Sequence, residues 1–329
     1  AINLINPLRI NDIKKNIHLK WITLFITNYC SARCEHCFYS KELNNKVEEL
    51  HLENLKKIFS SLKKPLNTLR ITGGEPFLNK SLEDFFLFID KNRISKKVNI
   101  TTHGMVPNLD LRVEKMLSNS TNSHLHIGIS LDGLEETHNA FRKIKNGFQL
   151  AIKHLLDLKK FSEKNSRFTF STTTTLIRKI CTQQDSKGRI ELLDLIEYLT
   201  KKIGVKNIGV SHVRTIKNDV FDVPNDIISN FGLPPKIDEQ IKEKHTRGDE
   251  VQLNVNEIEK INTILKKGCL SNDYLTMRRL EIEHEILKNK KRIVDCLAGY
   301  VDCVIYPSLD VSVCESTKPF ANLKNFNYD

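Results

Sequence analysis

Three cysteines lie close together in one short segment of the sequence. Cys30, Cys34 and Cys37 form the pattern C-x3-C-x2-C within TNYCSARCEHCFYS, residues 27–40. Cysteines spaced this closely are seldom accidental, and in a reducing compartment clustered thiols are more often metal ligands than disulfide partners. The segment directly follows WITLFIT at 21–27, an apolar run typical of a buried strand. The spacing therefore predicts a metal or cluster site in the loop after that strand.

Zinc and an iron–sulfur cluster are the main alternatives for this loop. A structural zinc site normally takes four protein ligands, and His36 is the fourth candidate by residue type. However, His36 is adjacent to Cys37, so the two side chains are poorly placed to converge on one ion. Iron–sulfur clusters of the [4Fe–4S] type usually take four Cys ligands, so three thiolates would leave one iron open to an outside ligand. Unligated thiols are the remaining alternative.

Strand-like and helix-like segments alternate from about residue 20 to residue 213. Short β-branched and apolar runs predict strands at 21–27, 67–72, 97–102, 124–131, 167–177 and 206–213. Apolar residues at helical spacing predict helices at 51–63, 81–92, 108–119, 146–160 and 189–203. Ser81 is the predicted N-cap of the second helix. Six alternations indicate an α/β fold with a parallel sheet, either a partial barrel or an open doubly wound sheet.

In both sheet forms, ligands bind at the carboxyl ends of the strands. The alternation stops after Val213, and the Pro-rich and charged residues that follow predict a linker or lid. Helical patterns return at 255–266 and 274–290, and two β-rich runs around Pro-Ser-Leu-Asp predict a C-terminal hairpin. We therefore expect an N-terminal segment, a core, a linker or lid and a C-terminal extension, at residues 1–19, 20–213, 214–250 and 251–329.

The cysteine pattern and several later motifs resemble the radical S-adenosylmethionine (SAM) superfamily. ITGGEP at 71–76 resembles the Gly-Gly-Glu motif of that family, and TTHG at 101–104 stands where many relatives have Thr-Asn-Gly. SLDG at 130–133 resembles the strand-four segment, and HNAFRKIKNGF at 138–148 resembles the His-x3-Arg stretch after it. The resemblance covers residues 20 to about 213 and implies a partial (β/α)6 barrel, similar to part of a TIM barrel.

The resemblance implies that Cys30, Cys34 and Cys37 hold a [4Fe–4S] cluster and that SAM binds the open iron. One electron from the reduced cluster would then cleave SAM to methionine and a 5'-deoxyadenosyl radical, which abstracts hydrogen from the substrate. The cofactor supplies this chemistry, while the protein positions the substrate and excludes water. We expect an electron donor such as flavodoxin or ferredoxin, and we predict no catalytic residue beyond the cluster ligands.

The resemblance also implies which residues contact SAM. Glycine lets a backbone approach a ligand closely, and the Gly-Gly-Glu segment is expected to accept the SAM ammonium. Ser130 and Asp132 are expected to bind the ribose hydroxyls, and Arg142 to pair with the SAM carboxylate; without the resemblance, turn capping and a solvated helix arginine are the alternatives. His103 departs from the Asn of the family, and we assign it no role. The predicted contacts are Phe38, Gly73, Gly74, Glu75, Pro76, Thr102, Ser130, Asp132 and Arg142.

The C-terminal cysteines resemble a second motif. CLAGYVDCVIYPSLDVSVC at 296–314 is similar to the opening of the SPASM/twitch extension, which carries auxiliary iron–sulfur clusters in many relatives. Leu309 and Ala321 replace Gly residues of that pattern. Three alternatives stay open: further ligands from a downstream segment, a cluster held by this chain's own cysteines, or an extension without a cluster. The possible auxiliary ligands are Cys269, Cys296, Cys303 and Cys314, and we expect Cys181 to be a loop or core thiol.

Composition narrows the class of protein and of substrate. The net charge of +11 suits an acidic partner, but Lys alternates with Glu on polar helix faces and no RNA-binding motif is present, so nucleic acid is not the expected partner. No apolar run is long enough for a membrane span, and eight cysteines without a secretion signal indicate the cytoplasm. We expect a peptide or protein side chain, or a sugar or nucleoside-type molecule, as substrate. Radical SAM modification of RNA and a non-enzymatic zinc-binding module are the alternatives.

Overall fold

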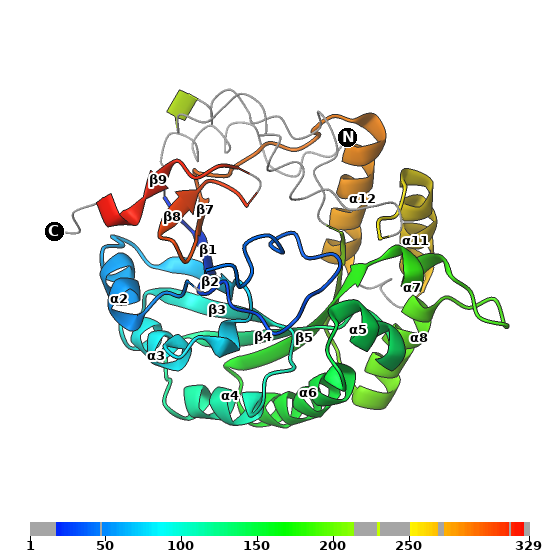
Figure 1. Ribbon diagram of the computed structural model, residues 1–329, viewed down its shortest axis with the longest axis horizontal. Helices are drawn as coiled ribbons and strands as arrows, with labels where there is room; N and C mark the ends of the chain where they lie inside the picture. Colours follow the sequence, from blue (N-terminus) through cyan, green and yellow to red (C-terminus); the bar gives the residue numbers. More distant parts are fainter. Residues whose placement is uncertain are drawn as a thin grey trace.

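The computed structural model describes residues 18–46, 48–213, 229–230, 251–268, 273–315 and 317–325. Within them, six parallel strands alternate with helices (Figure 1). Each strand lies within two residues, at either end, of its predicted range. The strands are β1 (Trp21–Phe25), β2 (Leu66–Thr72), β3 (Ser95–Thr102), β4 (His124–Ser130), β5 (Phe168–Leu176) and β6 (Ile208–His212).

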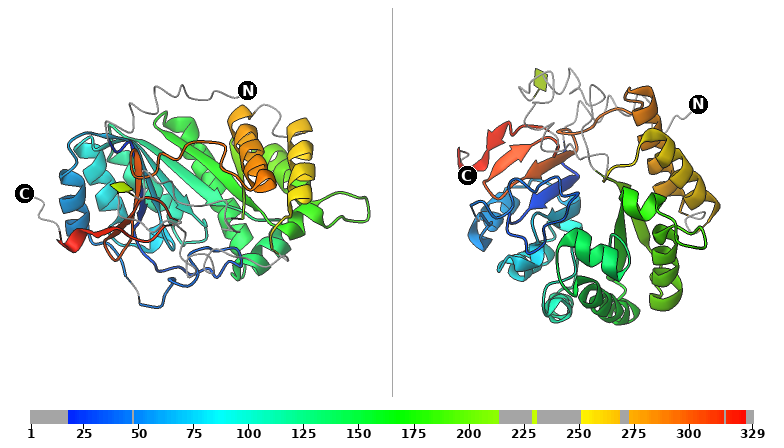
Figure 2. Two further views of the ribbon diagram at one scale, coloured as in Figure 1. Left: turned by 90° about the horizontal axis from the view of Figure 1, so that it is seen from above. Right: turned by 45° about the vertical axis from the view of Figure 1, so that its right-hand side comes forward.

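Helices cover the convex face of the curved sheet (Figures 1 and 2). The predicted helices are confirmed, whereas the short α5 and α7 were not predicted. The helices are α2 (Leu52–Ser60), α3 (Leu82–Lys91), α4 (Leu109–Ser118), α5 (Glu135–Arg142), α6 (Gly147–Lys164), α7 (Arg178–Thr182) and α8 (Glu191–Glu197), with the short η1 (Pro76–Leu78) and the π-helical η2 (Tyr198–Ile203).

The strands lie in the order β6-β5-β4-β3-β2-β1, and every neighbouring pair is parallel. Successive residues of a strand point to opposite faces. On β4, Leu125, Ile127 and Ile129 are fully buried toward the helices, whereas His126 and Ser130 point to the concave face. With helices on one face and polar residues on the other, the sheet is a partial barrel. This confirms the predicted α/β class and excludes the doubly wound form.

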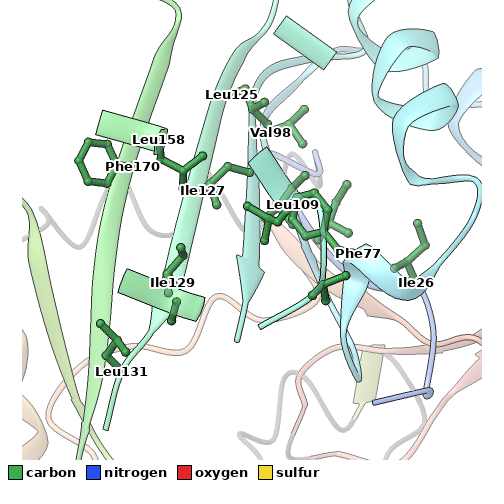
Figure 3. Close-up of a cluster of buried hydrophobic side chains, with 14 of the residues drawn as sticks. Ile26, Phe77, Val98, Leu109, Leu125, Ile127, Ile129, Leu131, Leu158 and Phe170 are labelled. Carbon is green, nitrogen blue, oxygen red and sulfur yellow. The ribbon is translucent and has the colours of Figure 1, made fainter. Parts of the chain in front are cut away.

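Apolar side chains between the sheet and the helices form the core (Figure 3). Val98 of β3 and Ile127 of β4 pack in it with Leu109 of α4 and Leu158 of α6, and all four are completely buried. Burying one such side chain stabilises a fold by about 1.5–3 kcal/mol. This layer therefore fixes the strands whose carboxyl ends carry the predicted site residues.

The start of α3 differs in detail from the prediction. Ser81 occupies the N-cap position, but its side chain makes no capping hydrogen bond. Instead, the side-chain oxygen of Asn79 accepts a hydrogen bond from the Ser81 N–H at 2.8 Å. The Asn79 amide also donates to the carbonyls of Ile26 and Leu50, at 3.3 Å and 3.1 Å. Asn79 thereby ties the start of α3 to the chain that leaves β1.

C-terminal strands extend the same sheet beyond β1. Strand β7 (Asp302–Ile305) is parallel to β1, β8 (Asp310–Ser312) is antiparallel to β7, and β9 (Ala321–Asn322) is antiparallel to β8. The short η4 (Leu323–Asn325) follows. The predicted C-terminal hairpin is confirmed. Its pairing with β1 joins distant parts of the chain, which the local sequence patterns did not reveal.

Leu309, for which the SPASM/twitch resemblance predicted Gly, adopts a left-handed conformation with φ of +70°. This conformation costs a non-Gly residue about 1–2 kcal/mol. The Leu309 N–H donates to the Tyr306 carbonyl at 2.9 Å, and its carbonyl accepts from the Leu323 N–H at 2.8 Å. The side chain is also buried, so packing and hydrogen bonds offset the strain of this turn.

Two helices follow the predicted lid. Helix α11 (Val255–Lys267) begins with a capping box between Asn254 and Glu257, and α12 (Tyr274–Asn289) contacts β6, where Arg279 donates to the Val210 carbonyl. Apart from residues 229–230, the lid predicted at 214–250 lies outside the described residues.

No helix in the described part of the chain is both long enough and apolar enough to cross a membrane.

Candidate active site

A cavity of about 440 Å³ lies at the carboxyl ends of the parallel strands. Its walls come from the loop after β1, from the ends of β2 to β6, and from β7 with the residues after β8. Cys30, Cys34 and Cys37 all line this cavity. The structure therefore brings the three predicted cluster ligands to the strand edge at which a partial barrel binds its ligands.

Hydrogen bonds hold the cysteine loop in place. The Cys30 N–H donates to the side-chain oxygen of Asn44 at 3.0 Å, and the Asn44 amide donates back to the Cys30 carbonyl at 3.0 Å. Arg33 donates to the same carbonyl at 2.7 Å, and the Cys37 N–H donates to the Cys34 carbonyl at 3.1 Å. The loop is thus ordered by the chain's own groups.

Burial suppresses thiolate formation in the metal-free protein. Burial, together with the nearby carboxylate of Glu75, raises the pKa of Cys30 to about 12. Burial also raises the pKa of Cys34, although the nearby guanidinium of Arg142 opposes this shift. A bound metal deprotonates a coordinating thiol outright, so loading of iron is expected to release protons from these two residues.

Gly73 and Gly74 line the cavity, but their first task is to let the cysteine segment approach. A Cβ atom on Gly73 would lie 2.3 Å from the Thr27 carbonyl oxygen, and one on Gly74 would lie 2.2 Å from the Tyr29 carbonyl oxygen. The Gly74 N–H donates to that Thr27 oxygen at 2.7 Å. Close backbone approach was predicted for a ligand, whereas the structure shows it for the segment that leads into Cys30.

Glu75 is completely buried, and both carboxylate oxygens have partners. One oxygen accepts hydrogen bonds from the Thr102 hydroxyl at 2.7 Å and from the Phe77 N–H at 3.0 Å. The other accepts from the His103 N–H at 2.9 Å and lies 3.3 Å from the His103 ring nitrogen Nε2. The carboxylate thus joins the ends of β2 and β3. Direct contact with an ammonium stays a prediction, and Glu75 is not among the residues that line the cavity.

Asp132 and Arg142 form a buried ion pair. Arg142 Nη2 lies 2.5 Å from Asp132 Oδ2, and both residues are at most 5% exposed. Burial opposes ionisation of Asp132, but Arg142 and the Thr175 N–H hold its pKa at about 2. The pKa of Arg142 is raised because Asp132 outweighs its burial. The sequence assigned the two side chains to different parts of SAM, whereas the structure pairs them with each other.

The remaining predicted SAM contacts fall into two groups. Phe38, Thr102 and Ser130 line the cavity, and the ring of Phe38 packs edge-on against Phe25 with centroids 6.3 Å apart. Pro76 is buried at the start of η1, away from the lining residues. Arg142 also lines the cavity, and its Nε atom is buried without a hydrogen-bond partner among the described residues. Its ion pair with Asp132 therefore leaves a donor unused.

Among the described residues, three histidines line the cavity and none was predicted as a site residue; two of them, His36 and His103, lie within the sequence motifs. His36 stacks on Phe141 with ring centroids 5.1 Å apart, and its Nε2 lies 3.3 Å from the Thr175 hydroxyl and 3.8 Å from Asp132. His103 lies at the end of β3 and is 5% exposed. Each was visible in the sequence, His36 between two cysteines and His103 inside TTHG. However, their contacts come from distant residues.

The C-terminal cysteines do not share one environment. Cys314 lines the cavity, and Cys296 is partly buried. Cys303 lies on β7 between Asp302 and Val304, which both line the cavity, so its own side chain points to the opposite face. Cys269 lies outside the described residues, and Cys181 is buried in α7 as expected. The auxiliary ligand set stays a prediction. Two of its members, Cys303 and Cys314, lie on different sides of the sheet.

No three His, Cys, Asp or Glu side chains among the described residues are grouped in a way that could hold a single metal ion.

The residues around the cavity fit a cluster and SAM together. Three cysteines line one cavity, beside Gly73, Gly74, Ser130 and the Arg142 guanidinium with its unused donor. These groups supply soft ligands for iron and hydrogen-bond partners for a carboxylate and a ribose.

Comparison with known proteins decides the family of this part of the chain. The sequence pattern described as the Radical SAM superfamily matches residues 24–180. Residues 24–180 form a radical SAM domain. Members of this superfamily are enzymes, and the family uses a [4Fe–4S] cluster and SAM. The domain spans β1 to α7 and includes the three cysteines, the Gly-Gly-Glu segment and the Asp132–Arg142 pair.

Relatives of the radical SAM domain are named for different activities. GTP 3',8-cyclase of Helicobacter pylori is 24% identical over 204 residues, which cover 61% of this chain and 57% of the cyclase. The sporulation killing factor maturation protein SkfB of Bacillus subtilis is 29% identical over 144 residues, which cover 44% of this chain and 33% of SkfB. The matched region thus spans little more than half of the cyclase and a third of SkfB.

Solved structures share the fold at low sequence identity. Streptococcus suis SuiB bound to SAM has a TM-score of 0.58 at 14% identity, and the match covers 94% of this chain and 66% of SuiB. The protein named anSMEcpe, with bound SAM and a peptide, has a TM-score of 0.57 at 15% identity, with 94% and 76% covered. These matches show the fold and extend beyond the radical SAM domain. They do not confirm the SPASM/twitch resemblance.

Proposed function

We propose that the chain is a radical SAM enzyme in which Cys30, Cys34 and Cys37 bind a [4Fe–4S] cluster. The observation that carries the proposal is that the three cysteines line one cavity together with Gly73 and Gly74. When bound, the cluster and SAM supply a 5'-deoxyadenosyl radical for hydrogen abstraction. The chain's own residues hold the iron, orient SAM and keep water from the reacting atoms.

The residues around the cavity can orient SAM in a defined way. The Arg142 guanidinium is kept charged by Asp132, and its unused Nε donor suits a carboxylate. The Ser130 hydroxyl at the end of β4 suits a ribose hydroxyl, and the ring of Phe38 beside Cys37 suits the adenine. Asp132 acts mainly through Arg142 in this proposal, because the ion pair occupies its Oδ2 atom.

A peptide or protein side chain is the substrate class that we favour, with a nucleoside-type molecule as the alternative. SkfB is named as a maturation protein, and structures of SuiB and anSMEcpe contain bound peptides. The cyclase named for GTP supports the alternative. Modification of RNA is favoured only by the net charge of +11, and it predicts binding that weakens steeply as salt rises.

The proposal is tested by anaerobic reconstitution with iron and sulfide. We expect about four iron and four sulfide per chain if one [4Fe–4S] cluster is bound, and SAM-dependent 5'-deoxyadenosine after reduction with a low-potential donor such as flavodoxin or ferredoxin. Zinc without iron and sulfide would instead support the zinc-binding module. An oxygen-sensitive cluster of this kind suits a reducing compartment, so we place the enzyme in the cytoplasm.

A further inference from the structure

His103 lies in the TTHG segment, and the proposed function leaves it without a task. It directly follows β3, at the position where the family resemblance of the sequence predicts Asn. The ring lines the cavity, and the residue is only 5% exposed. The ring forms hydrogen bonds with the Met105 N–H and with Ser31 of the cysteine loop, and the backbone N–H of His103 donates to the carboxylate of Glu75.

The contacts of the ring fix its tautomer. The backbone N–H of Met105 donates to Nδ1 at 2.9 Å, and a backbone N–H can only donate, so Nδ1 presents its lone pair. In the neutral ring the proton is therefore on Nε2. Burial lowers the pKa of His103, and Arg142 lowers it further while Glu75 opposes both, so the neutral form prevails.

The Nε2–H group faces two acceptors from different segments. The hydroxyl oxygen of Ser31 lies 3.1 Å away, and Oε2 of Glu75 lies 3.3 Å away. Ser31 is next to Cys30 in the cysteine loop, and Glu75 ends the Gly-Gly-Glu segment. A second link runs in parallel, because the Glu75 N–H donates to the Tyr29 carbonyl at 2.8 Å.

We infer that His103 is a positioning residue that fixes the cysteine loop against the Gly-Gly-Glu segment through its Nε2–H. The inference rests on the proposed function, since the fixed geometry matters only if a cluster and SAM share the cavity. An Asn side chain ends at the level of Nδ1. It can keep an acceptor for the Met105 N–H, but it cannot reach Ser31. The longer imidazole therefore adds a link that the common family residue lacks.

A double-mutant cycle between His103→Asn and Ser31→Ala tests this link. The readout is the Kd for SAM, measured by equilibrium dialysis on anaerobically reconstituted, unreduced protein, so no turnover is involved. Each single variant should weaken SAM binding about five- to tenfold, as expected for one partly buried hydrogen bond. The double variant should be no weaker than either single one. Thermal melting of the metal-free proteins is recorded alongside.

His154→Gln is the matched control. His154 is a buried histidine on α6 whose Nδ1 lies 2.8 Å from the Gly104 carbonyl, and it does not line the cavity. This control should lower the melting temperature and leave the Kd for SAM within about twofold of wild type.

Two results would overturn the inference. One is wild-type SAM affinity in Ser31→Ala, and the other is additive losses in the double variant, which would mean that His103 acts on SAM directly. Ser31 is exposed, so its variant decides the question even if His103→Asn does not fold. Wild-type protein that takes up no cluster or binds no SAM would instead contradict the proposed function.

Discussion

The Asp132–Arg142 pair controls the charge beside the cavity. Both groups are buried, and a buried ion pair is costly to break because the remaining partner stays charged and desolvated. Asp132→Asn should therefore lower the free energy of unfolding of the metal-free protein by about 3 kcal/mol, as measured by urea denaturation. The matched control is Glu197→Gln, which removes a partner of the exposed Arg189. The control should change stability little, and an equal loss in both variants would contradict the account.

The same pair predicts a pH dependence. Arg142 holds the pKa of Asp132 at about 2, below its ordinary value of 3.8. A carboxylate with a lowered pKa stabilises the folded state above its ordinary pKa, and this contribution is lost as the pH falls toward 2. The stability advantage of wild type over Asp132→Asn should thus shrink by about 2 kcal/mol between pH 5 and pH 2. Urea denaturation at each pH measures it, and an advantage that stays constant would contradict this assignment.

Most residues that the sequence predicted for the site line the cavity, but their partners were not predicted. Cys30, Gly73 and Ser130 follow strands, and their place at the strand edge could be predicted from hydrophobic patterns alone. That Glu75 would face Thr102 and His103, or that Arg142 would face Asp132, depends on distances between loops. Side-chain pairing across a sheet is not encoded in local periodicity, so these assignments required the structure.

At the scale of the element, Gly74 lets the chain that leaves β2 pack closely against the backbone of the cysteine segment. A Cβ atom there would lie 2.2 Å from the Tyr29 carbonyl oxygen, which is backbone and cannot move aside cheaply. Gly74→Ala should destabilise the metal-free protein by more than about 2 kcal/mol and reduce iron uptake, measured by urea denaturation and metal analysis. Gly209→Ala on β6 is the matched control, because its nearest contacts would be at an ordinary 3.6 Å. Equal effects in the two variants would sink this explanation.

The C-terminal hairpin offers a second test at this scale. The positive φ of Leu309 lowers the stability of the fold by about 1–2 kcal/mol, whereas burial of its side chain raises the stability by about 2–3 kcal/mol. Leu309→Gly should therefore lower the free energy of unfolding by about 1 kcal/mol, measured by urea denaturation. A more stable variant would show that packing of Leu309 does not hold the turn.

Element prediction succeeded where the pattern was long and failed where it was short or non-local. The strands and the longer helices were predicted because their apolar residues recur at the expected spacing. The five-residue α7 and the polar α5 lack such a repeat. The pairing of β7 with β1 was not predicted, because no local sequence pattern around Asp302 indicates that this residue pairs with Trp21.

At the scale of the whole molecule, the C-terminal strands complete the wall of the cavity. Asp302, Val304 and Cys314 line it together with the three cysteines of the radical SAM domain. The region matched by the family and the region after it therefore share one cavity. A substrate in this cavity would contact both regions. We therefore expect the C-terminal residues of the cavity wall to contribute to substrate specificity.

The number of clusters is a property of the whole chain. Reconstituted protein should contain about four iron if only the first cluster forms, and about eight if the C-terminal cysteines bind another. Because Cys303 faces away from the cavity, Cys303→Ala should keep the iron content of wild type. Loss of about four iron in that variant, measured by metal and sulfide analysis, would place Cys303 among the ligands.

The most direct test of the central claim is the formation of 5'-deoxyadenosine from SAM by the reduced, reconstituted protein. The account predicts SAM-dependent product from wild type and none from Cys34→Ala. Cys181→Ala, which removes a buried thiol that does not line the cavity, should keep the activity. No 5'-deoxyadenosine from wild-type protein with a full cluster, even with peptide and nucleotide candidates present, would contradict the assignment of this site.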